Sequence, residues 1–269
     1  MRYSKRMAAS LAVIAALWVV PAAADLKIGV TPGVVADSII TAAEEAKSRG
    51  LAVEVIEFAD WATPNLALAS GDLDLNFFQH EAFLENAIKE TGFDLVPVAK
   101  GFLPNIGLYS LKYDSLEALP DGAKVAVAND PVNQGRALVL LSDAGLIGLA
   151  EGVGYLGTLD DVTSNPKNLA FVEIEGPQLV RAIEDVDLAQ GYPAHYVSAG
   201  NPDLAGRALV YSGVGETRFA IAFVSRRDNA EDPEIAQFVE IYQSAPDVEA
   251  KIAEHYAGNP VLYSLPWKK

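Results

Sequence analysis

The chain has 269 residues, a formal net charge of −16, 51% hydrophobic residues and no cysteine. The lack of cysteine excludes disulfide scaffolds, Cys-ligated metal sites and a thiol nucleophile, and the hydrophobic content excludes intrinsic disorder. Because 36 Asp and Glu side chains outnumber 20 Lys and Arg side chains, the protein lacks the basic surface that nucleic acids and anionic membranes require of a partner.

The first 24 residues have the three parts of a secretory signal peptide. Basic side chains precede an apolar run from Met7 to Val20, and three alanines lie immediately before Asp25. The apolar run is about 14 residues long, shorter than the ~20 residues of a transmembrane helix, so we expect cleavage rather than anchoring. No cysteine stands at the expected cleavage point to carry an acyl chain. The sequence therefore predicts a periplasmic protein that is not a lipoprotein.

Short apolar segments alternate with helical patterns from Leu26 onward. Two of the early helical patterns end at glycine, at Gly50 and Gly71, as helices commonly do. This repeated β-α-β order is typical of a parallel sheet covered by helices on both faces. The expected elements are strand 26–30, helix 38–49, strand 51–58, helix 62–70, strand 73–78 and helix 81–91.

A second series of the same kind follows residues 94–112. This extended segment contains Pro97, Pro104 and Gly107, so it cannot form one regular element, and we interpret it as a crossover. The second series is expected to contain strand 124–128, helix 134–146, strand 169–174, helix 178–184, strand 186–189 and strand 207–211. An extended block at 218–225 and helices 233–244 and 248–256 complete the chain.

Two α/β units joined by extended segments indicate two lobes that face a cleft. The C-terminal helices are free to return to the first unit. We expect lobe 1 to contain residues 25–110 and 219–269 and lobe 2 to contain residues 111–218. Clefts of this kind are where small ligands bind in α/β proteins.

The segment from Gly152 to Gly157 has the spelling of the G-x-G-x-x-G dinucleotide motif. That motif binds pyrophosphate where it follows a strand and begins a helix, so that free backbone N–H groups meet the phosphates. Here it follows the end of a helical pattern and leads into a loop. We therefore expect no nucleotide cofactor.

Other catalytic and metal-binding motifs are missing from the sequence. It contains no P-loop, no G-x-S-x-G and no H-E-x-x-H, and the three histidines are isolated at positions 80, 195 and 255. The adjacent acids Asp160 and Asp161 lack the alternating spacing of a calcium loop. No metal site and no cofactor are predicted. A histidine site assembled from distant segments stays open, because such residues converge in space rather than in sequence.

Two segments at the ends of predicted strands combine polar and aromatic side chains. In residues 129–136, an Asp-Pro pair ends a strand and begins a strong helix, with Arg136 one turn inside it. Free N–H groups at a helix start and a planar guanidinium both suit a carboxylate, although a surface acid could equally pair with Arg136. In residues 76–80, aromatic rings and His80 stand at a strand end, where core packing is the alternative to ligand binding.

Short segments spread over nearly the whole chain after residue 24 share their order and spacing with one protein family. They are Gly29–Gly33, Pro64–Asn65, Gly71–Asp74, Asn76–His80, Asp94–Val98, Gly107–Ser110, Leu119–Gly122, Asn129–Pro131, Gly135–Leu138 and Asn165–Leu169. Together they resemble the NlpA/MetQ-type methionine-binding proteins of ABC importers.

The resemblance implies an α/β, two-lobe periplasmic-binding-protein fold of type II, with two crossover segments and a ligand cleft between the lobes. It also implies an amino-acid ligand, usually methionine. By position, Arg136 matches the family arginine that grips the ligand carboxylate. Phe78 and His80 match residues around the ligand side chain, and Trp61 falls where the family commonly has a tyrosine.

Two polar contacts of the family pattern are absent from this sequence. After Ala189 the family usually offers an asparagine, whereas this chain continues with Gln190, and on the return strand the family asparagine is replaced by Ile221. Loss of a buried polar partner costs about 1–3 kcal/mol, so we expect substitute contacts or a ligand other than methionine. The complete set of candidate ligand-binding residues is Arg136, His80, Phe78, Trp61, Tyr192, Asn133, Asn105 and Gln190.

The sequence thus predicts a periplasmic substrate-binding protein of an ABC importer, which binds an amino acid or a related small carboxylate and is not an enzyme. The first alternative is the same receptor role for another amino acid, a short peptide or a non-amino-acid carboxylate. The second is a lyase or dehydratase on this fold, with His80 or His195 as the base. We expect a monomer whose partners are the small ligand and the inner-membrane permease complex.

Overall fold

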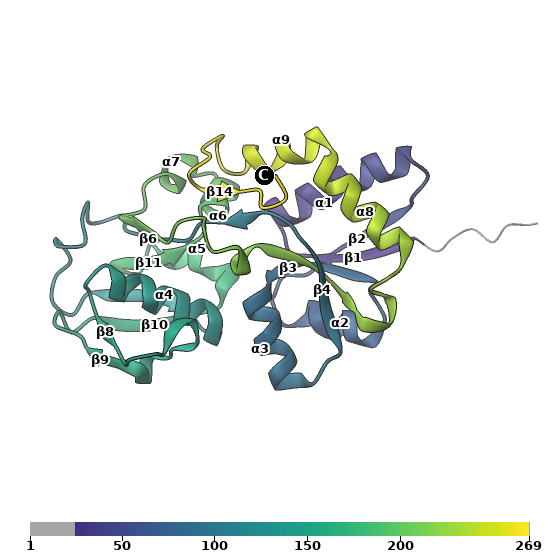
Figure 1. The fold of residues 1–269 in the computed structure, drawn as a ribbon. Helices are drawn as coiled ribbons and strands as arrows, with labels where there is room; N and C mark the ends of the chain where they lie inside the picture. Colours follow the sequence, from purple (N-terminus) through teal and green to yellow (C-terminus); the bar gives the residue numbers. More distant parts are fainter. Residues whose placement is uncertain (1–24, 269) are drawn as a thin grey trace, which may run out of the picture.

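The computed structural model describes residues 25–268, in which two five-stranded sheets form the centres of two lobes (Figure 1). The predicted signal peptide, residues 1–24, lies outside the described residues. Among the described helices, none has both the length and the apolar character that crossing a membrane would require. The two-lobed α/β arrangement agrees with the alternation of apolar and helical segments in the sequence.

The first sheet is parallel except at the strand that arrives from late in the sequence. Its strands, in spatial order, are β2 (Val53–Glu57), β1 (Leu26–Val30), β3 (Leu75–His80), β13 (Ile221–Arg226) and β4 (Leu95–Lys100). β13 runs antiparallel to both β3 and β4. Successive side chains of a strand point to opposite faces, so Phe223 packs in one core cluster and Ala222 and Val224 in another.

Five helices cover the two faces of this sheet. α2 (Thr63–Ser70) and α3 (Glu81–Thr91) contribute Leu68 and Leu84 to the core on one face. The core on the other face is formed with α1 (Val34–Ser48), α8 (Pro233–Ser244) and α9 (Pro246–Glu254). Figure 1 shows the C-terminal helices, in yellow and green, lying against the purple α1, so the end of the chain returns to the first lobe.

The second sheet repeats this plan. Its strands, in spatial order, are β10 (Ala170–Ile174), β7 (Lys124–Ala128), β11 (Leu188–Gly191), β6 (Gly107–Tyr109) and β12 (Val210–Tyr211). β10, β7 and β11 are parallel, and β6 and β12 complete the sheet with antiparallel pairings. α4 (Pro131–Asp143) covers one face, and α5 (Leu179–Ala182) and α6 (Pro193–Ser198) contribute to the core on the other.

Two connections link the sheets. The first runs from β4 to β6 and contains β5 (Leu103–Pro104), which pairs with β14 (Tyr263–Ser264) near the C-terminus. The second runs from β12 to β13 and contains the short 3-10 helix η4 (Thr217–Phe219). The lobe limits 25–110 with 219–269 and 111–218 stay a prediction, and the pairing of β6 within the second sheet favours a first limit before Gly107.

Small elements complete the described chain. They are α7 (Pro202–Ala205), the hairpin of β8 (Gly148–Leu149) with β9 (Val162–Ser164), and the 3-10 helices η1 (Gly154–Leu156), η2 (Leu159–Asp161), η3 (Gly176–Gln178) and η5 (Arg227–Asn229). The G-x-G-x-x-G segment contains η1, which packs against α4. A Cβ atom at Gly135 of α4 would lie 2.2 Å from the carbonyl oxygen of Tyr155, so glycine is required at this close approach.

Agreement between predicted and observed ends does not follow the length of the pattern, since the helix expected at 134–146 is α4 at Pro131–Asp143. Strands 26–30 and 124–128 and helices 81–91 and 233–244 are confirmed at both ends. α1 begins four residues earlier than expected, because Gly33 adopts φ 90° and turns the chain directly from β1 into the helix. The short helices α6 and α7 were not predicted, since one or two turns carry no hydrophobic periodicity.

Candidate ligand-binding site

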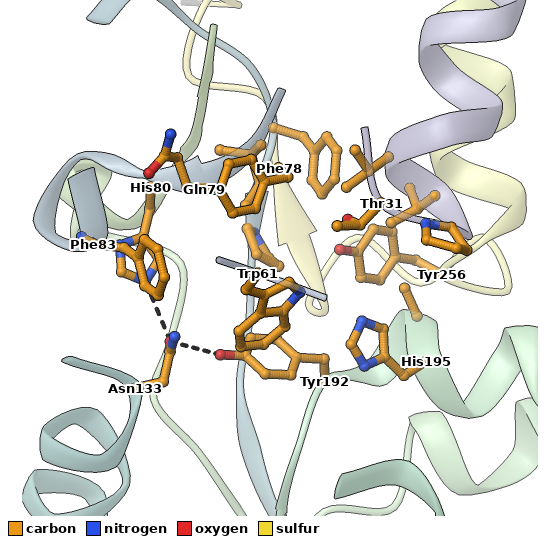
Figure 2. Close-up of a pocket in the computed structure, with 17 residues that line it drawn as sticks. Thr31, Trp61, Phe78, Gln79, His80, Phe83, Asn133, Tyr192, His195 and Tyr256 are labelled. Carbon is orange, nitrogen blue, oxygen red and sulfur yellow. Dashed lines mark hydrogen bonds between the residues drawn. The ribbon is translucent and has the colours of Figure 1, made fainter. Parts of the chain in front are cut away.

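A cavity of about 60 Å³ lies where side chains of both lobes meet. Its walls are mainly aromatic, formed by Trp61, Phe78, Phe83, Phe102, Tyr192 and Tyr256 (Figure 2). A space of this size holds a few water molecules, so a larger ligand would have to separate the lobes to enter.

Trp61 brings the two lobes into contact at this cavity. It lies in the loop before α2 of the first lobe, and its indole packs edge-on against Tyr192 of the second lobe, with ring centroids 6.1 Å apart. The indole also lies over Gly176, where a Cβ atom would approach the ring to 1.9 Å. Only glycine at position 176 therefore allows this contact between the lobes.

His80 is positioned by the direct passage from β3 into α3. It is the N-cap of α3, and its Nδ1 accepts a hydrogen bond from the backbone N–H of Phe83 at 3.1 Å. Because Nδ1 accepts, the proton of the neutral ring is on Nε2, which donates to Oδ1 of Asn133 at 3.3 Å. Burial, aided by the positive charge of Arg136, lowers the pKa of His80 to about 3. The imidazole is therefore neutral at neutral pH.

The start of α4 holds Asn133 toward the same cavity. The carboxylate of Asp130 caps the helix by accepting from the backbone N–H of Asn133 at 2.9 Å, and it also accepts from the Asn133 amide. This orients Oδ1 of Asn133 to accept from the hydroxyl of Tyr192 at 2.7 Å (Figure 2). Burial raises the pKa of Asp130, although the hydrogen bonds from Asn133 oppose that shift.

Arg136 is a buried cation, with only 4% of its surface exposed. Its guanidinium carbon lies 4.0 Å from the ring centroid of Phe219, and its Nη1 atom has no hydrogen-bond partner among the described residues. No ion pair of Arg136 is formed within residues 25–268. Burial lowers the pKa of the guanidinium, because the charged form has lost its water.

Arg136 is not among the residues that line the aromatic cavity and belongs instead to the wall of a second cavity, of about 190 Å³. It lines the second cavity together with Tyr155 and Phe219. Its charge also acts on His80 and Tyr192, which line the aromatic cavity. The cation therefore contributes to the electrostatic field at the His80 end of the aromatic cavity.

The opposite end of the aromatic cavity carries Thr31, His195 and Tyr256 (Figure 2). Thr31 follows β1, Tyr256 follows α9, and His195 lies in α6 of the second lobe. The ring of His195 lies 5.2 Å from that of Tyr192, centroid to centroid. Burial lowers the pKa of His195 to about 4, so this imidazole is also neutral at neutral pH.

The structure brings together most of the residues singled out in the sequence. Trp61, Phe78, His80, Asn133 and Tyr192 all line the aromatic cavity, whereas Arg136 lines the second cavity and acts on His80 and Tyr192 through its charge. Ile221, expected from the resemblance to stand where the family has an asparagine, also lines the aromatic cavity.

Two of the residues proposed from the sequence as ligand-binding have side chains that are hydrogen-bonded to backbone away from the cavity. The side chain of Gln190 accepts from the backbone N–H of Ala128 at 2.9 Å and donates to the carbonyl of Asn133 at 3.0 Å, which ties β7 to α4. The amide of Asn105 donates to the carbonyl of Val261 and accepts from Gly213 N–H. Neither residue lines the aromatic cavity, and the polar atoms of both are bonded to neighbouring backbone, so we remove both from the candidate set.

Several cavity residues were not among the sequence candidates for ligand binding. Thr31 could have been found, because it stands at the carboxyl end of a parallel strand, where ligands bind in α/β folds. His195 was considered only as a base, and Tyr256 gave no local signal because it follows a short helix far away in the sequence. Within residues 25–268 no cluster of His, Asp and Glu has the arrangement of a metal site.

Comparison with known proteins gives consistent similarities. The model of the family described as NlpA lipoprotein matches residues 26–262. The D-methionine-binding lipoprotein MetQ of Escherichia coli K12 is 40% identical over 230 residues, which cover 84% of this chain and 83% of that protein. The crystal structure of a methionine-binding protein, MetQ, superimposes with a TM-score of 0.84 at 38% identity and covers 91% of this chain and 99% of that one.

A periplasmic substrate-binding protein of an ABC transporter from Coxiella burnetii is similar as well. It has a TM-score of 0.81 at 35% identity and covers 89% of this chain and 99% of that chain. These similarities confirm the predicted fold class. The relatives are binding proteins rather than enzymes, so the lyase or dehydratase alternative has no support from them.

One prediction about location is wrong. The matching family is described as a lipoprotein family, and the Escherichia coli relative is named a lipoprotein, which contradicts the prediction that the protein is not one. That prediction rested on the absence of a single residue type, cysteine, and similarity over residues 26–262 outweighs it. A periplasmic location is consistent with the Coxiella burnetii neighbour.

Proposed function

The chain belongs to the NlpA lipoprotein family, and from this membership we propose that it is the substrate-binding protein of an ABC importer for methionine or a closely related amino acid. Relatives named as methionine-binding proteins, similar over more than four fifths of this chain, support methionine as the first ligand to consider. The partner would be the inner-membrane permease complex of that importer, as the Coxiella burnetii neighbour suggests.

The observation that carries this proposal is the unpaired, buried guanidinium of Arg136. A charge removed from water is costly unless a counter-charge or hydrogen bonds compensate it. Arg136 has a cation–π contact with Phe219 but no anionic partner within the described residues, and its Nη1 donor is unsatisfied. A ligand carboxylate would supply both the missing charge and the missing acceptor, in the two-bond geometry that a guanidinium prefers.

The remaining candidates give the ligand an enclosed, mostly apolar surrounding. Trp61 and Phe78 offer aromatic surface for a flexible apolar side chain, which suits a thioether. The hydroxyl of Tyr192, on which the charge of Arg136 acts, donates to Asn133 and keeps an oxygen lone pair that could accept from a ligand ammonium group. Contacts from both lobes would stabilise the closed arrangement only when the ligand is bound.

A ligand other than methionine remains a second candidate because of Ile221. This side chain lines the cavity, and the resemblance drawn from the sequence implies that it takes the place of a family asparagine. Loss of a buried polar partner costs about 1–3 kcal/mol, so affinity for a ligand that relied on that contact falls by about five- to 150-fold. Such a change leaves room for another amino acid, a short peptide or another carboxylate to bind as well as methionine.

Isothermal titration calorimetry tests the proposal directly. We expect L- or D-methionine, or another amino acid of similar size, to bind the purified protein with micromolar or tighter affinity. Methionine amide, which lacks the carboxylate, is the matched control and should bind at least about 30-fold more weakly, because Arg136 then faces no anion. Equal binding of the acid and the amide would remove Arg136 from the site. Absence of binding by every amino acid would refute the proposed function.

A further inference from the structure

The end of the aromatic cavity remote from Arg136 contains three polar groups with no assigned role. Among residues 25–268, no hydrogen bond is formed by the hydroxyl of Thr31, the imidazole of His195 or the hydroxyl of Tyr256. Tyr256 is 1% exposed and Thr31 is 9% exposed, so neither hydroxyl is solvated as it would be on an open surface. None of their polar atoms is among the fully buried atoms that lack a partner in the described residues, so each keeps some surface open to the cavity that all three line, where a ligand atom can reach it.

The three groups are all uncharged at neutral pH. Burial keeps the imidazole of His195 neutral and raises the pKa of Tyr256 well above its ordinary value. The described residues that line the cavity include no Asp, Glu, Lys or Arg. This end of the cavity can donate to a neutral acceptor, but it offers no counter-charge to a charged group.

The three groups also come from both lobes. Thr31 and Tyr256 belong to the first lobe, where Tyr256 is held by stacking on Tyr263 at a centroid distance of 4.7 Å. His195 belongs to α6 of the second lobe and packs beside Tyr192. A ligand atom bonded by all three would therefore link the lobes at the end opposite Arg136.

We propose that Thr31, His195 and Tyr256 form a polar subsite that binds a neutral hydrogen-bond acceptor at the end of the ligand side chain, such as a sulfoxide or primary amide oxygen. This inference rests on the proposed function, because it takes Arg136 to hold the ligand carboxylate at the other end. A thioether sulfur is a weak acceptor and would leave the three groups poorly satisfied. An oxygen at that position would accept from the Tyr256 and Thr31 hydroxyls and from the His195 N–H.

The test compares amino acids that are similar in length and differ at the end of the side chain. Methionine, norleucine, methionine sulfoxide, glutamine and glutamate are titrated into the wild-type protein by calorimetry. We expect methionine sulfoxide, glutamine or both to bind at least about fivefold more tightly than norleucine, which has no acceptor, since one or two neutral hydrogen bonds are gained. Glutamate should bind more weakly than glutamine, because the subsite offers no counter-charge.

Two variants test whether the preference for an acceptor-bearing ligand depends on Tyr256 and Thr31. Tyr256→Phe keeps the stacked ring and removes only the hydroxyl, and Thr31→Val keeps the side-chain shape. Each substitution should lower the affinity for methionine sulfoxide or glutamine by about three- to tenfold and change the affinity for norleucine by no more than about twofold. Having two variants keeps the test intact if one of them does not fold.

The outcomes separate this inference from the function on which it rests. If norleucine and methionine bind as tightly as the acceptor-bearing ligands, the subsite is refuted and the receptor role stands. The same holds if the variants weaken every ligand equally, because the groups would then contact the common amino-acid portion. If no amino acid binds the wild-type protein, the receptor role itself is refuted, and this inference with it.

Discussion

Two buried polar regions of this protein differ in how completely their hydrogen bonds are satisfied. Behind the end of β3, Asn65 and Gln79 donate to one another's carbonyl oxygens, and the amide of Asn76 donates to Asn65 and to the carbonyl of Pro64. At the start of α4, Arg136 has an unsatisfied Nη1 and no acidic partner within residues 25–268.

The difference separates groups that hold the fold from groups that await a ligand. A satisfied buried network rigidifies its surroundings, whereas an unsatisfied buried charge lowers stability until a partner arrives. Gln79 lines the cavity, but its amide is already bonded within the Asn65, Asn76 and Gln79 network, hereafter the amide network. Proximity to the cavity is therefore a weaker sign of ligand binding than an unused hydrogen-bonding group.

The largest effect is expected from Arg136→Met, which keeps much of the side-chain length and removes the charge. We expect ligand affinity to fall by about 2–5 kcal/mol, at least about 30-fold, as for loss of one partner of a buried charge pair. Stability of the ligand-free protein should stay equal or rise, because the substitution removes an unpaired buried cation. Calorimetry and urea denaturation measure the two quantities. Lower stability with unchanged affinity would show that Arg136 is structural.

The opposite result is expected in the amide network. Asn76→Leu removes the side-chain donor to the carbonyl of Pro64, one of the two donors to Oδ1 of Asn65 and an acceptor of Gln79, so we expect the free energy of unfolding to fall by about 1–3 kcal/mol. Ligand affinity should stay within about twofold. Asn86→Ala is the control, because its amide bonds only Glu90 on an exposed helix surface, and it should change stability by less than about 0.5 kcal/mol. A selective loss of ligand affinity in Asn76→Leu would contradict the distinction.

The two histidines that line the aromatic cavity should make the stability of the protein depend on pH. Burial lowers the pKa of His80 to about 3 and of His195 to about 4, from an ordinary value of 6.5. Below pH 6.5 the unfolded chain binds protons that the folded protein does not, so stability is complete above that pH and decreases as pH falls toward 4. Each imidazole contributes a slope of up to about 1.4 kcal/mol per pH unit.

Urea denaturation between pH 7.5 and 5 measures this slope. The variant His195→Gln keeps a neutral polar side chain. It should reduce the slope of the free energy of unfolding against pH by the contribution of one imidazole, up to about 1.4 kcal/mol per pH unit. An unchanged slope in the variant would mean that His195 titrates normally and is open to water.

The smallest effect is expected from two tyrosines in neighbouring positions. Tyr192→Phe removes the hydroxyl that donates to Asn133 at 2.7 Å, so ligand affinity should fall by about two- to tenfold. Tyr196→Phe removes a buried hydroxyl that has no partner among the described residues, so stability should stay equal or increase slightly and affinity should not change. Thermal unfolding and calorimetry of both variants test this pair. Equal effects of the two substitutions would contradict the role of the Tyr192 hydroxyl.

Sequence patterns predicted much of the fold and part of the candidate site. The alternation of strands and helices was readable because each element buries one regularly spaced face. Arg136 and His80 were found because they stand at strand-to-helix junctions within segments that resemble one family. The structure places His80 in the wall of the aromatic cavity and Arg136 in the wall of the second cavity, and their roles in binding stay a proposal.

Gln190 and Asn105 show why the other site predictions needed the structure. In a sequence, a polar residue at a strand end looks the same whether it faces a ligand or a neighbouring backbone group. The side-chain amide of Gln190 is hydrogen-bonded to the backbone of Ala128 and Asn133. The side-chain amide of Asn105 is hydrogen-bonded to segments more than 100 residues later in the chain. Tyr256 shows the converse, since a tyrosine after a C-terminal helix gives no sign that it will reach the cavity.

The sequence by itself determined the class of fold, the family and the strand ends where ligand contacts gather, because these follow from local periodicity and from motifs that stay together in the chain. The tertiary structure alone decided which polar groups are satisfied. A hydrogen bond is satisfied or left open by residues far away in the sequence, as with the donors from Tyr192 to Asn133 and from Asn105 to Val261. The unpaired state of Arg136, and the open hydroxyl of Tyr256, are therefore properties of how the two lobes pack together.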